Sequence, residues 1–356
     1  MRFHLDSDQI AIQDTLFGVV SEVLTREKLD AFIDGEGDFE PDSWAAVSEL
    51  EFFGLMVPEA LGGSGLGLLE AALVSESLGR AAAPGPFIGQ FLTAIALSST
   101  TNETARDAFL DGVAKGKTIS TFAFGGNWLP ESWSVESDGK SARGEVRFVP
   151  SANAASLFLT GTKNGGIALV EAGDEVAINR HRSTDRSRPA SAVKFDEAAA
   201  HTLFEPGDPL VQRLFDAALV LIAADALGGA QYCTDLSVSY AKEREQFGQP
   251  IGRFQALKHQ LSTMALNVEP SRSLVWYAAH AWDEEQKDAS RTAALAKAHL
   301  CDRFVEVTRD AIATHGGIGY TWEYGLNIWF RRSVFDRAVL GSPSVHRERA
   351  ATLAGW

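Results

Sequence analysis

The sequence of 356 residues is short of cysteine, contains no long apolar run and has fewer basic than acidic residues. Its two cysteines, Cys233 and Cys301, lie far apart in helical patterns, so neither a disulfide framework nor a zinc-binding spacing is present. The longest uninterrupted apolar run, residues 217–224, is far too short to span a membrane. The first residues contain no apolar signal core. We therefore expect a protein of the reducing cytoplasm without a membrane segment.

The excess of acidic over basic residues limits the kinds of molecule that this protein is expected to bind. Lys and Arg number 32 against 47 Asp and Glu, which gives a formal net charge of −15 at pH 7. Because phosphate groups would be repelled over most of such a surface, duplex nucleic acid and anionic membranes are excluded as main partners. The 8 histidines include no pair at helical spacing beside a Glu, so no metal site is expected. With 45% apolar and 22% charged residues, the composition is that of a globular protein of two or three domains.

The residues that are present fall into segments of different periodicity. Residues 1–117 show helical patterns: Asp6 and Gln9 have the spacing of a capping box, Pro41 suits a first helical turn, and Gly116 suits a helix C-cap. The period then changes to alternation, and short strands are expected at residues 119–124, 133–136, 145–149, 156–159, 166–171 and 192–195.

The last segment returns to a helical period with long apolar stripes. Leu257, Leu261, Met264 and Val268 recur at the spacing i, i+4, i+7 and i+11. Long helices with short connections are typical of a bundle. The sequence therefore predicts a mostly α fold with a central β domain, made of an N-terminal helical domain (1–117), a middle β-barrel-like domain (118–204) and a C-terminal four-helix bundle (205–356).

Two corners between helical patterns carry the candidate binding residues. The first, residues 244–259, reads Arg-Glu-Gln-Phe-Gly-Gln-Pro-Ile-Gly-Arg-Phe-Gln-Ala-Leu-Lys-His. Arg244 offers a planar donor fork suited to phosphate or carboxylate, and Gln255 offers an amide that donates and accepts. Phe247 supplies an apolar anchor. Taken alone, an ordinary turn with a surface arginine is the simpler interpretation.

The second corner, residues 315–323, is rich in glycine. Gly316, Gly317 and Gly319 follow His315 at the end of a helical pattern. Taken alone, this is a helix C-cap, because glycine adopts the left-handed conformation without a steric penalty. Glycines at a corner also allow a backbone to approach phosphate groups closely.

The motifs at these corners resemble those of the acyl-CoA dehydrogenase family. They are Arg-x-x-Phe-Gly followed by Ile-x-x-Phe-Gln at the first corner and Gly-Gly-x-Gly-Tyr at the second. The order of helical domain, β domain and helical bundle is similar to that family's architecture over nearly the whole chain. The resemblance implies FAD as the cofactor. It also implies contacts with the FAD of a neighbouring subunit for Arg244, Phe247, Gln255, Gly316, Gly317 and Gly319.

The resemblance fails where the family keeps its catalytic base. The reaction needs a carboxylate that removes the proton α to the thioester, while the β hydrogen leaves as hydride to the flavin. That carboxylate follows the Gly-x-Gly-Tyr loop, where this chain has Leu340, or lies on the preceding long helix, where this chain has Ala218. Ala313 stands where the family has a glutamine near the cofactor. Asp216 is the best-placed substitute base, and Glu245 is the second.

The middle segment also departs from the family. Residues 122–128 and 148–151 replace polar segments that wrap the flavin ring and the acyl chain. Groups for this subunit's own site are therefore missing, whereas groups for a neighbour's FAD remain. This asymmetry resembles heterotetrameric (α2β2) bacterial members, some from steroid degradation, in which one subunit type carries the base and the other completes the cofactor site.

Three hypotheses stay open at this point. The first is the auxiliary subunit of a heteromeric FAD-dependent acyl-CoA dehydrogenase, active only with a homologous catalytic subunit. Its substrate would be an acyl-CoA such as a steroid side-chain thioester, and its electron acceptor an electron-transfer flavoprotein. The second is a catalytically complete homotetramer with a displaced base. The third is a flavin- or partner-binding protein of the same fold without dehydrogenase activity.

Overall fold

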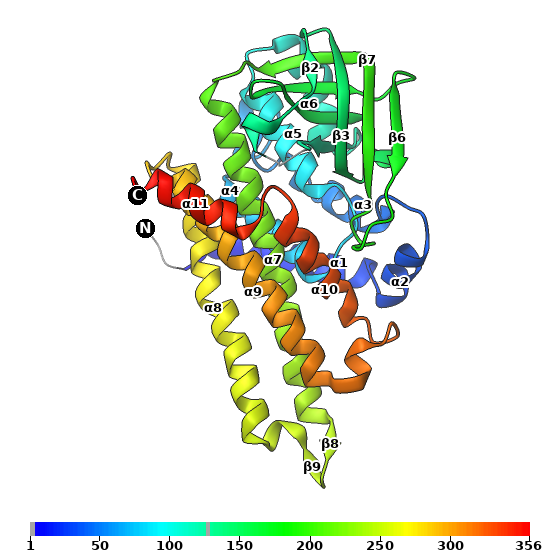
Figure 1. The fold of residues 1–356 in the computed structure, drawn as a ribbon, viewed down its shortest axis with the longest axis vertical. Coiled ribbons are helices and arrows are strands. Elements are labelled where there is room, and N and C mark those ends of the chain that lie inside the picture. The colour runs from blue at the N-terminus through cyan, green and yellow to red at the C-terminus, as the bar shows by residue number, and fades with distance from the viewer. Residues whose placement is uncertain (1–3, 126–128) are drawn as a thin grey trace.

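The computed structural model describes residues 4–125 and 129–356 (Figure 1). A curved sheet lies at one end of the molecule, and long helices run from it to the opposite end. The predicted fold class, mostly α with a central β domain, is confirmed. No helix in the described ranges is both long and apolar enough to cross a membrane.

The amino-terminal helices begin and end where the sequence supplies caps. The Asp6 carboxylate accepts from the backbone N–H of Gln9, and the Gln9 side chain accepts from the backbone N–H of Asp6, which is the predicted capping box. Pro41 lies in the first turn of its helix, and Gly116, at φ +64°, follows the last helix of this segment. The helices are α1 (Ser7–Val23), α2 (Arg26–Asp34), α3 (Pro41–Glu49), α4 (Leu68–Arg80), α5 (Phe87–Ser99) and α6 (Glu103–Ala114).

The strands β1 to β7 form one mixed sheet with the order β1-β4-β5-β7-β3-β2, and β6 pairs with β7. Only β1 and β4 are parallel neighbours within this sheet. The long strand β7 pairs with β5 along one part and with β3 and β6 along the other, so it joins the two halves. The strands are β1 (Ser120–Ala123), β2 (Glu136–Ser137), β3 (Ser141–Pro150), β4 (Leu157–Thr162), β5 (Gly166–Glu171), β6 (Val176–Arg180) and β7 (Ala190–Phe204).

Several elements differ from the predicted pattern. The short helix α2 and the strand β6 were not predicted, and the strand expected at 133–136 is reduced to Glu136–Ser137. β7 is far longer than the predicted 192–195. Its alternation is interrupted because Glu197 adopts a left-handed conformation (φ 63°) at a β-bulge, where the register with β3 shifts. Residues 126–128 of the predicted flavin segment lie outside the described residues.

The carboxy-terminal helices pack as a bundle around an apolar interior. The face Leu300, Phe304, Val307 and Ala311 is completely or almost completely buried, as its spacing predicts. Both cysteines are buried and free, and burial raises the pKa of the Cys301 thiol to about 12. The helices are α7 (Pro209–Glu243), α8 (Gln255–Asp283), α9 (Ala289–His315), α10 (Leu326–Ala338) and a short additional α11 (Pro343–Leu353) that packs on α9.

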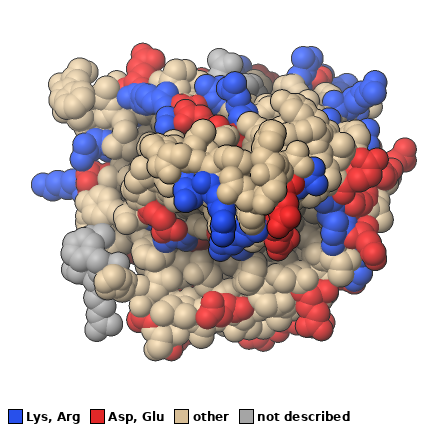
Figure 2. All heavy atoms as spheres, turned by 90° about the horizontal axis from the view of Figure 1, so that it is seen from below, with Lys and Arg blue, Asp and Glu red and all other residues tan. Residues whose placement is uncertain are grey.

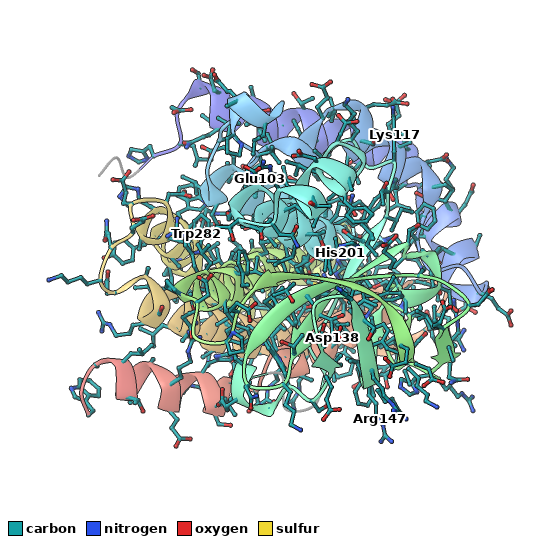
Figure 3. The ribbon with its side chains drawn as sticks, turned by 90° about the horizontal axis from the view of Figure 1, so that it is seen from above. Glu103, Lys117, Asp138, Arg147, His201 and Trp282 are labelled. Carbon is teal, nitrogen blue, oxygen red and sulfur yellow. The ribbon has the colours of Figure 1, made fainter. Side chains whose placement is uncertain are left out.

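Seen from the sheet end, the amino-terminal helices lie along one side of the sheet (Figure 3). Lys117 marks the side of the amino-terminal helices, and Arg147 marks the opposite side of the sheet. His201 on β7 faces α6, where its ring contacts that of Phe109 edge-on at 5.3 Å between centroids. The helical bundle therefore reaches away from the sheet, and its far end is free of the other segments.

Candidate functional site

The first corner is a two-residue hairpin at the far end of the bundle (Figure 1). Strand β8 (Glu245–Gln246) pairs with β9 (Gln249–Pro250), and the turn places Phe247 (φ 54°) and Gly248 (φ 78°) in the left-handed conformation. Two successive left-handed residues define the turn type that closes tight hairpins. The Phe247 side chain is 92% exposed at this turn. A large apolar ring held in solvent is suited to contact with another chain.

Arg244 lies at the base of this hairpin and caps α7. Its backbone N–H donates to the Tyr240 carbonyl, and its carbonyl accepts from the Ile251 N–H, each at 2.8 Å. The guanidinium is exposed and forms no hydrogen bond or ion pair within the described residues. The backbone of Arg244 is therefore fixed, while its donors remain available.

Gln255 begins α8 directly after the hairpin. Its amide Nε2 lies 2.8 Å from Nε2 of His259, one turn further along the helix. Thr263 and Asn267 continue at the same four-residue interval, so the four polar side chains follow one face of α8. This polar face leads from the first corner along the bundle.

The second corner lies beside the first. The rings of Tyr240 on α7 and His315 at the end of α9 are 4.3 Å apart between centroids, and His315 also contacts Tyr324 at 4.8 Å. Nδ1 of His315 donates to the Ala311 carbonyl at 2.7 Å. Burial lowers the pKa of His315, so the imidazole is neutral at pH 7 and serves as a packing group. The stack brings Arg244 and the glycine turn to the same end of the bundle.

The structural reason for glycine differs among the three glycines of the second corner. A Cβ at Gly319 would lie 2.7 Å from the Ile312 carbonyl oxygen, so packing within this chain demands glycine there. Gly316 has φ +64° and thus a conformation that favours glycine. Gly317 has neither restriction, since a Cβ there would meet nothing within 4 Å. Its missing side chain leaves room for a group from outside this chain.

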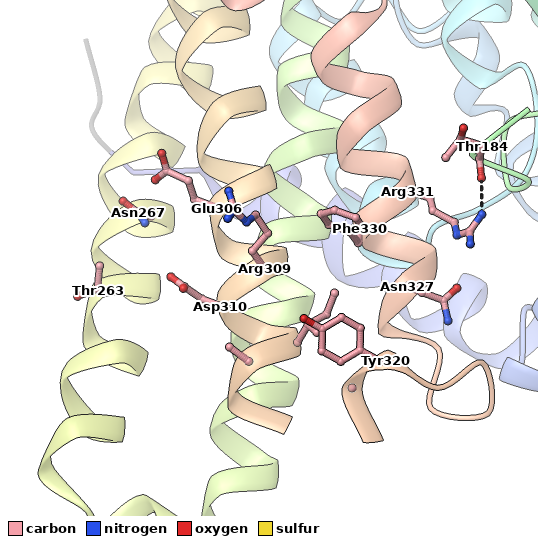
Figure 4. Close-up of a pocket in the computed structure, with 13 residues that line it drawn as sticks. Thr184, Thr263, Asn267, Glu306, Arg309, Asp310, Tyr320, Asn327, Phe330 and Arg331 are labelled. Atoms are coloured by element: carbon pink, nitrogen blue, oxygen red, sulfur yellow. Dashed lines mark hydrogen bonds between the residues drawn. The ribbon is translucent and has the colours of Figure 1, made fainter. Parts of the chain in front are cut away.

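A groove of about 830 Å³ extends from the glycine turn between α8, α9 and α10 (Figure 4). Its volume lies within the usual range of small-molecule and cofactor sites. Arg331 at one side donates to the Thr184 carbonyl (3.1 Å) and stacks over Trp322. Apolar and polar groups alternate along the groove, whose lining consists of Thr184, Thr263, Asn267, Glu306, Arg309, Asp310, Ile312, Ala313, Gly319, Tyr320, Asn327, Phe330 and Arg331.

Figure 2 shows the molecule from the hairpin end. Residues other than Lys, Arg, Asp and Glu fill much of the centre of this view, and both basic and acidic side chains lie among them. Phe247 is 92%, Tyr320 77% and Leu266 70% exposed. The sequence interpretation did not identify Arg309 or Asp310 as lining residues, although both share a helical face with Ala313.

The positions expected to carry a catalytic base are sealed. Leu340 and Ala218 are each 0% exposed. The Leu340 carbonyl accepts a hydrogen bond from Nε2 of His346 at 2.7 Å, and a Cβ on Gly341 would lie 2.9 Å from the same nitrogen. Both positions are therefore enclosed by this chain, and His346 packs directly against Leu340 and Gly341.

A buried cluster of charges fills the adjoining interior between the sheet and the bundle. Arg188, from the segment before β7, pairs with Asp225 on α7 (2.6 Å) and with Asp336 on α10. Arg332 on α10 donates to both Asp225 oxygens, at 2.6 and 3.0 Å. Lys297 on α9, 0% exposed, donates to the Asp336 carbonyl at 2.6 Å. The cluster ties three helices to the sheet.

The two carboxylates of this cluster differ in their titration. Burial alone would raise both pKa values, but Arg188 and Arg332 together lower the pKa of Asp225 to about 2. Burial and the neighbouring Asp225 charge outweigh the arginines at Asp336 and raise the pKa of its carboxyl. We regard Asp225 as the ionised partner of both arginines, because only it accepts from both.

The two substitute bases named from the sequence lie in different surroundings. The Asp216 carboxylate is 2% exposed and accepts from Gln212 (2.9 Å), Ser290 and Arg349 (2.5 Å). It therefore links α7 to α9 and α11, and burial raises its pKa in spite of Arg349. Glu245 is exposed on the hairpin. Neither carboxylate adjoins Leu340 or Ala218 in sequence or in its hydrogen bonds.

The comparisons with known proteins identify the family. The N-terminal domain model of acyl-CoA dehydrogenases matches residues 6–117, and the C-terminal domain model matches residues 207–354. The chain is 31% identical to acyl-CoA dehydrogenase IpdE2 of Mycolicibacterium smegmatis over 340 residues, 95% of this chain and 96% of that protein. The chain belongs to the acyl-CoA dehydrogenase family, and FAD is the cofactor of this family.

Further relatives add details of length and fold. Acyl-CoA dehydrogenase FadE34 of Mycobacterium tuberculosis is 30% identical over 95% of this chain, but only 46% of its own length is matched. The solved Tcur3481-Tcur3483 steroid ACAD G363A variant superposes with a TM-score of 0.90 at 28% identity, over 98% of each chain. The ChsE4-ChsE5 complex from M. tuberculosis has the same fold, with a TM-score of 0.89 at 23% identity over 100% of this chain and 99% of that one.

Proposed function

We propose that this chain is the auxiliary subunit of a heteromeric acyl-CoA dehydrogenase, which completes the FAD site of a homologous catalytic subunit. The observation that carries the proposal is the contrast between its two regions. Leu340 and Ala218 are fully buried and no carboxylate stands at either position, whereas Arg244 and the glycine turn are exposed at one end.

The exposed end fits FAD approached from outside this chain. The packing of this chain does not require glycine at position 317. A flavin nucleotide from outside could therefore lie against the backbone there. Arg244 would bind a phosphate or a ring edge through its planar donors, and Gln255 would add an amide contact. Phe247 would pack against the neighbouring subunit at the same place. When bound, FAD accepts the β hydrogen of the acyl chain as hydride.

The interior of this chain does not fit a substrate of its own. Proton removal α to a thioester needs a base within hydrogen-bond reach of that carbon. At the corresponding places this chain offers aliphatic side chains, and salt-bridged groups fill the adjoining space. The proton would therefore be removed by a carboxylate of the catalytic subunit, and this chain would bind and orient the cofactor.

A steroid-derived acyl-CoA is the substrate class that we propose. The support is the name of the steroid ACAD structure, which is 28% identical to this chain over 98% of its length. The heteromeric state has two supports. One solved relative is a complex of two named chains, ChsE4 and ChsE5, and the FadE34 chain continues well beyond the part matched here. An electron-transfer flavoprotein is the proposed acceptor.

One co-purification separates this proposal from its alternatives. The chain is expressed alone and together with the homologous dehydrogenase encoded beside it, and molecular mass, bound flavin and enoyl-CoA formation are measured. We expect turnover and stoichiometric flavin only in the co-purified complex. Full flavin and turnover in the lone chain, abolished by Asp216→Asn, would instead establish the homotetramer with a displaced base. Flavin binding without turnover in either preparation would favour the non-enzymatic alternative.

A further inference from the structure

We propose that Arg309 is an additional cofactor-binding residue, which contacts the diphosphate of the partner's FAD from the groove between α8 and α9. The inference rests on the proposed function, because it requires FAD to enter this groove from a neighbouring subunit. Arg309 lies near the carboxyl end of α9 and lines the groove together with Ala313 and Gly319 (Figure 4).

The charges around Arg309 leave it available. Glu306, its nearest acidic neighbour on one side, is paired with Arg303 at 2.7 Å. Asp310 forms no ion pair with Arg309 within the described residues; burial raises the pKa of its carboxyl, and the nearby Arg309 charge only partly offsets this. The other arginine of the groove, Arg331, is held by the Thr184 carbonyl and by stacking on Trp322. Arg309 is exposed and has no hydrogen-bond or ion-pair partner in the part of the chain that the structure describes.

The helix geometry places Arg309 on the groove face of α9. Residues 309 and 313 are four residues apart on the same face, which corresponds to about 6 Å along the axis. Ala313 contributes no polar group at its own position. The Arg309 side chain extends toward the amino-terminal part of α9, beside Glu306, so its guanidinium faces the groove beyond Ala313 as seen from the glycine turn (Figure 4). There it would form charge-assisted hydrogen bonds with a diphosphate, for which its planar fork is suited.

The groove and the first corner are connected by a row of polar side chains on α8. The polar face of α8 that starts at Gln255 reaches the groove lining at Thr263 and Asn267. The Gln260 side chain donates to the Asp310 carbonyl at 3.0 Å and fixes α8 against α9 at this level. A nucleotide that enters the groove from the glycine turn and extends past Ala313 would therefore meet Arg309.

The test measures FAD affinity of the assembled complex by flavin fluorescence after removal of the cofactor, at low and high salt. Arg309→Gln is expected to raise the dissociation constant about tenfold and to make it less sensitive to salt, because an ionic contact is lost. Arg309→Lys, which keeps the charge, is expected to stay within about threefold of the wild type. Arg291→Gln, an exposed arginine at the other end of α9, is the matched control and is expected to have no effect.

A second substitution tests the geometry directly. Adding Ala313→Gln to Arg309→Gln places an amide in the same space and is expected to restore part of the lost affinity. An unchanged dissociation constant and salt dependence in Arg309→Gln would overturn the inference. If Arg309→Gln leaves the affinity unchanged but Arg244→Ala weakens FAD binding in the same assay, only the role assigned to Arg309 is contradicted. If neither variant changes the affinity, the proposed function falls with it.

Discussion

The open end of the bundle and the sealed interior beside the sheet are built from the same helices, yet their polar groups are arranged in opposite ways. On α10, Arg331 faces the groove, while the next residue, Arg332, is 1% exposed and paired with Asp225. On α9, Arg309 lines the groove and Lys297 is completely buried. Successive helical residues point about 100° apart, so one helix can serve both regions.

This difference indicates where the chain can accept a ligand. In the interior, Arg188, Arg332 and Asp225 are paired with groups of the same chain, although Oδ2 of Asp336 has no hydrogen-bond partner within the described residues, and such a network tolerates little rearrangement. At the open end, the Arg244 guanidinium has no hydrogen-bond or ion-pair partner within the described residues, Gly317 has no packing reason to be glycine, and the Phe247 ring is 92% exposed although it contacts Phe254 edge-on. Incomplete surfaces of this kind are expected where a second subunit supplies the rest of the site.

The largest expected effect concerns the sealed interior. Asp225→Ala leaves Arg188 and Arg332 without their shared carboxylate, so we expect a loss of about 3–5 kcal/mol in the free energy of unfolding. The measurement is the shift of the urea midpoint. Asp302→Ala is the matched control, because the arginines that pair with Asp302 are about half exposed, and its loss is expected to stay below about 1 kcal/mol.

One result would weaken the contrast between the two regions. Equal midpoint shifts in the two variants would mean that the buried cluster contributes no more than a surface pair. Asp225→Asn provides a second reading if the alanine variant does not fold, since it keeps an acceptor for one arginine and should lose less stability than alanine.

The next effect concerns the open end. Arg244→Ala removes an exposed guanidinium that has no role in the packing of this chain, so we expect unchanged stability and normal assembly. FAD binding to the complex is expected to weaken by about 2–3 kcal/mol if a largely desolvated phosphate contact is lost. Fluorescence titration of flavin measures it. Arg253→Ala, another exposed arginine of the same corner, should leave the affinity as it is.

Unchanged flavin affinity in Arg244→Ala would count against the role of the corner. A fall in stability as large as the fall in affinity would show that Arg244 supports its own chain instead. Either result would remove the contrast between the two regions.

The sequence predicted the open end better than the interior. Arg244, Gln255 and the glycines lie within short motifs, so their spacing alone suggested a corner. The partners in the buried cluster lie far apart in sequence: Arg188 precedes β7, Asp225 is in the middle of α7, and Arg332 is on α10. No local periodicity relates such residues, because the sequence pattern of each helix or loop does not depend on its distant partners.

The same reasoning explains the errors in the sheet. Strand β7 was underestimated because its bulge at Glu197 interrupts the alternation that marks a strand. Within the groove, Arg309 was missed because its helical face is defined by the packing of α8 and α10 against α9. The capping box at Asp6 and the C-cap at Gly116 were predictable because they depend only on local geometry.

The smallest expected effect lies at the end of α8 that is opposite to Gln255. There Asp283 accepts from the backbone N–H groups of Leu68 (2.6 Å) and Leu69 (3.2 Å) and so caps α4. Burial raises the pKa of Asp283 from 3.8 to about 6. Because the folded state holds this proton more tightly than the unfolded chain, the contribution to stability is complete below about pH 4 and is lost as the pH rises through 6.

Asp283→Asn should therefore remove a pH dependence while keeping an acceptor for the cap. Between pH 4 and pH 7, the free energy of unfolding of the variant is expected to rise relative to the wild type by about 1 kcal/mol. Urea denaturation at several pH values measures the difference, with the exposed Glu285→Gln as the control. A difference that stays constant across this range would mean that Asp283 is ionised throughout. In that case the Asp283 end of α8 would hold an ionised carboxylate although it is largely buried, and the contrast between a satisfied interior and an incomplete open end would stop short of this helix.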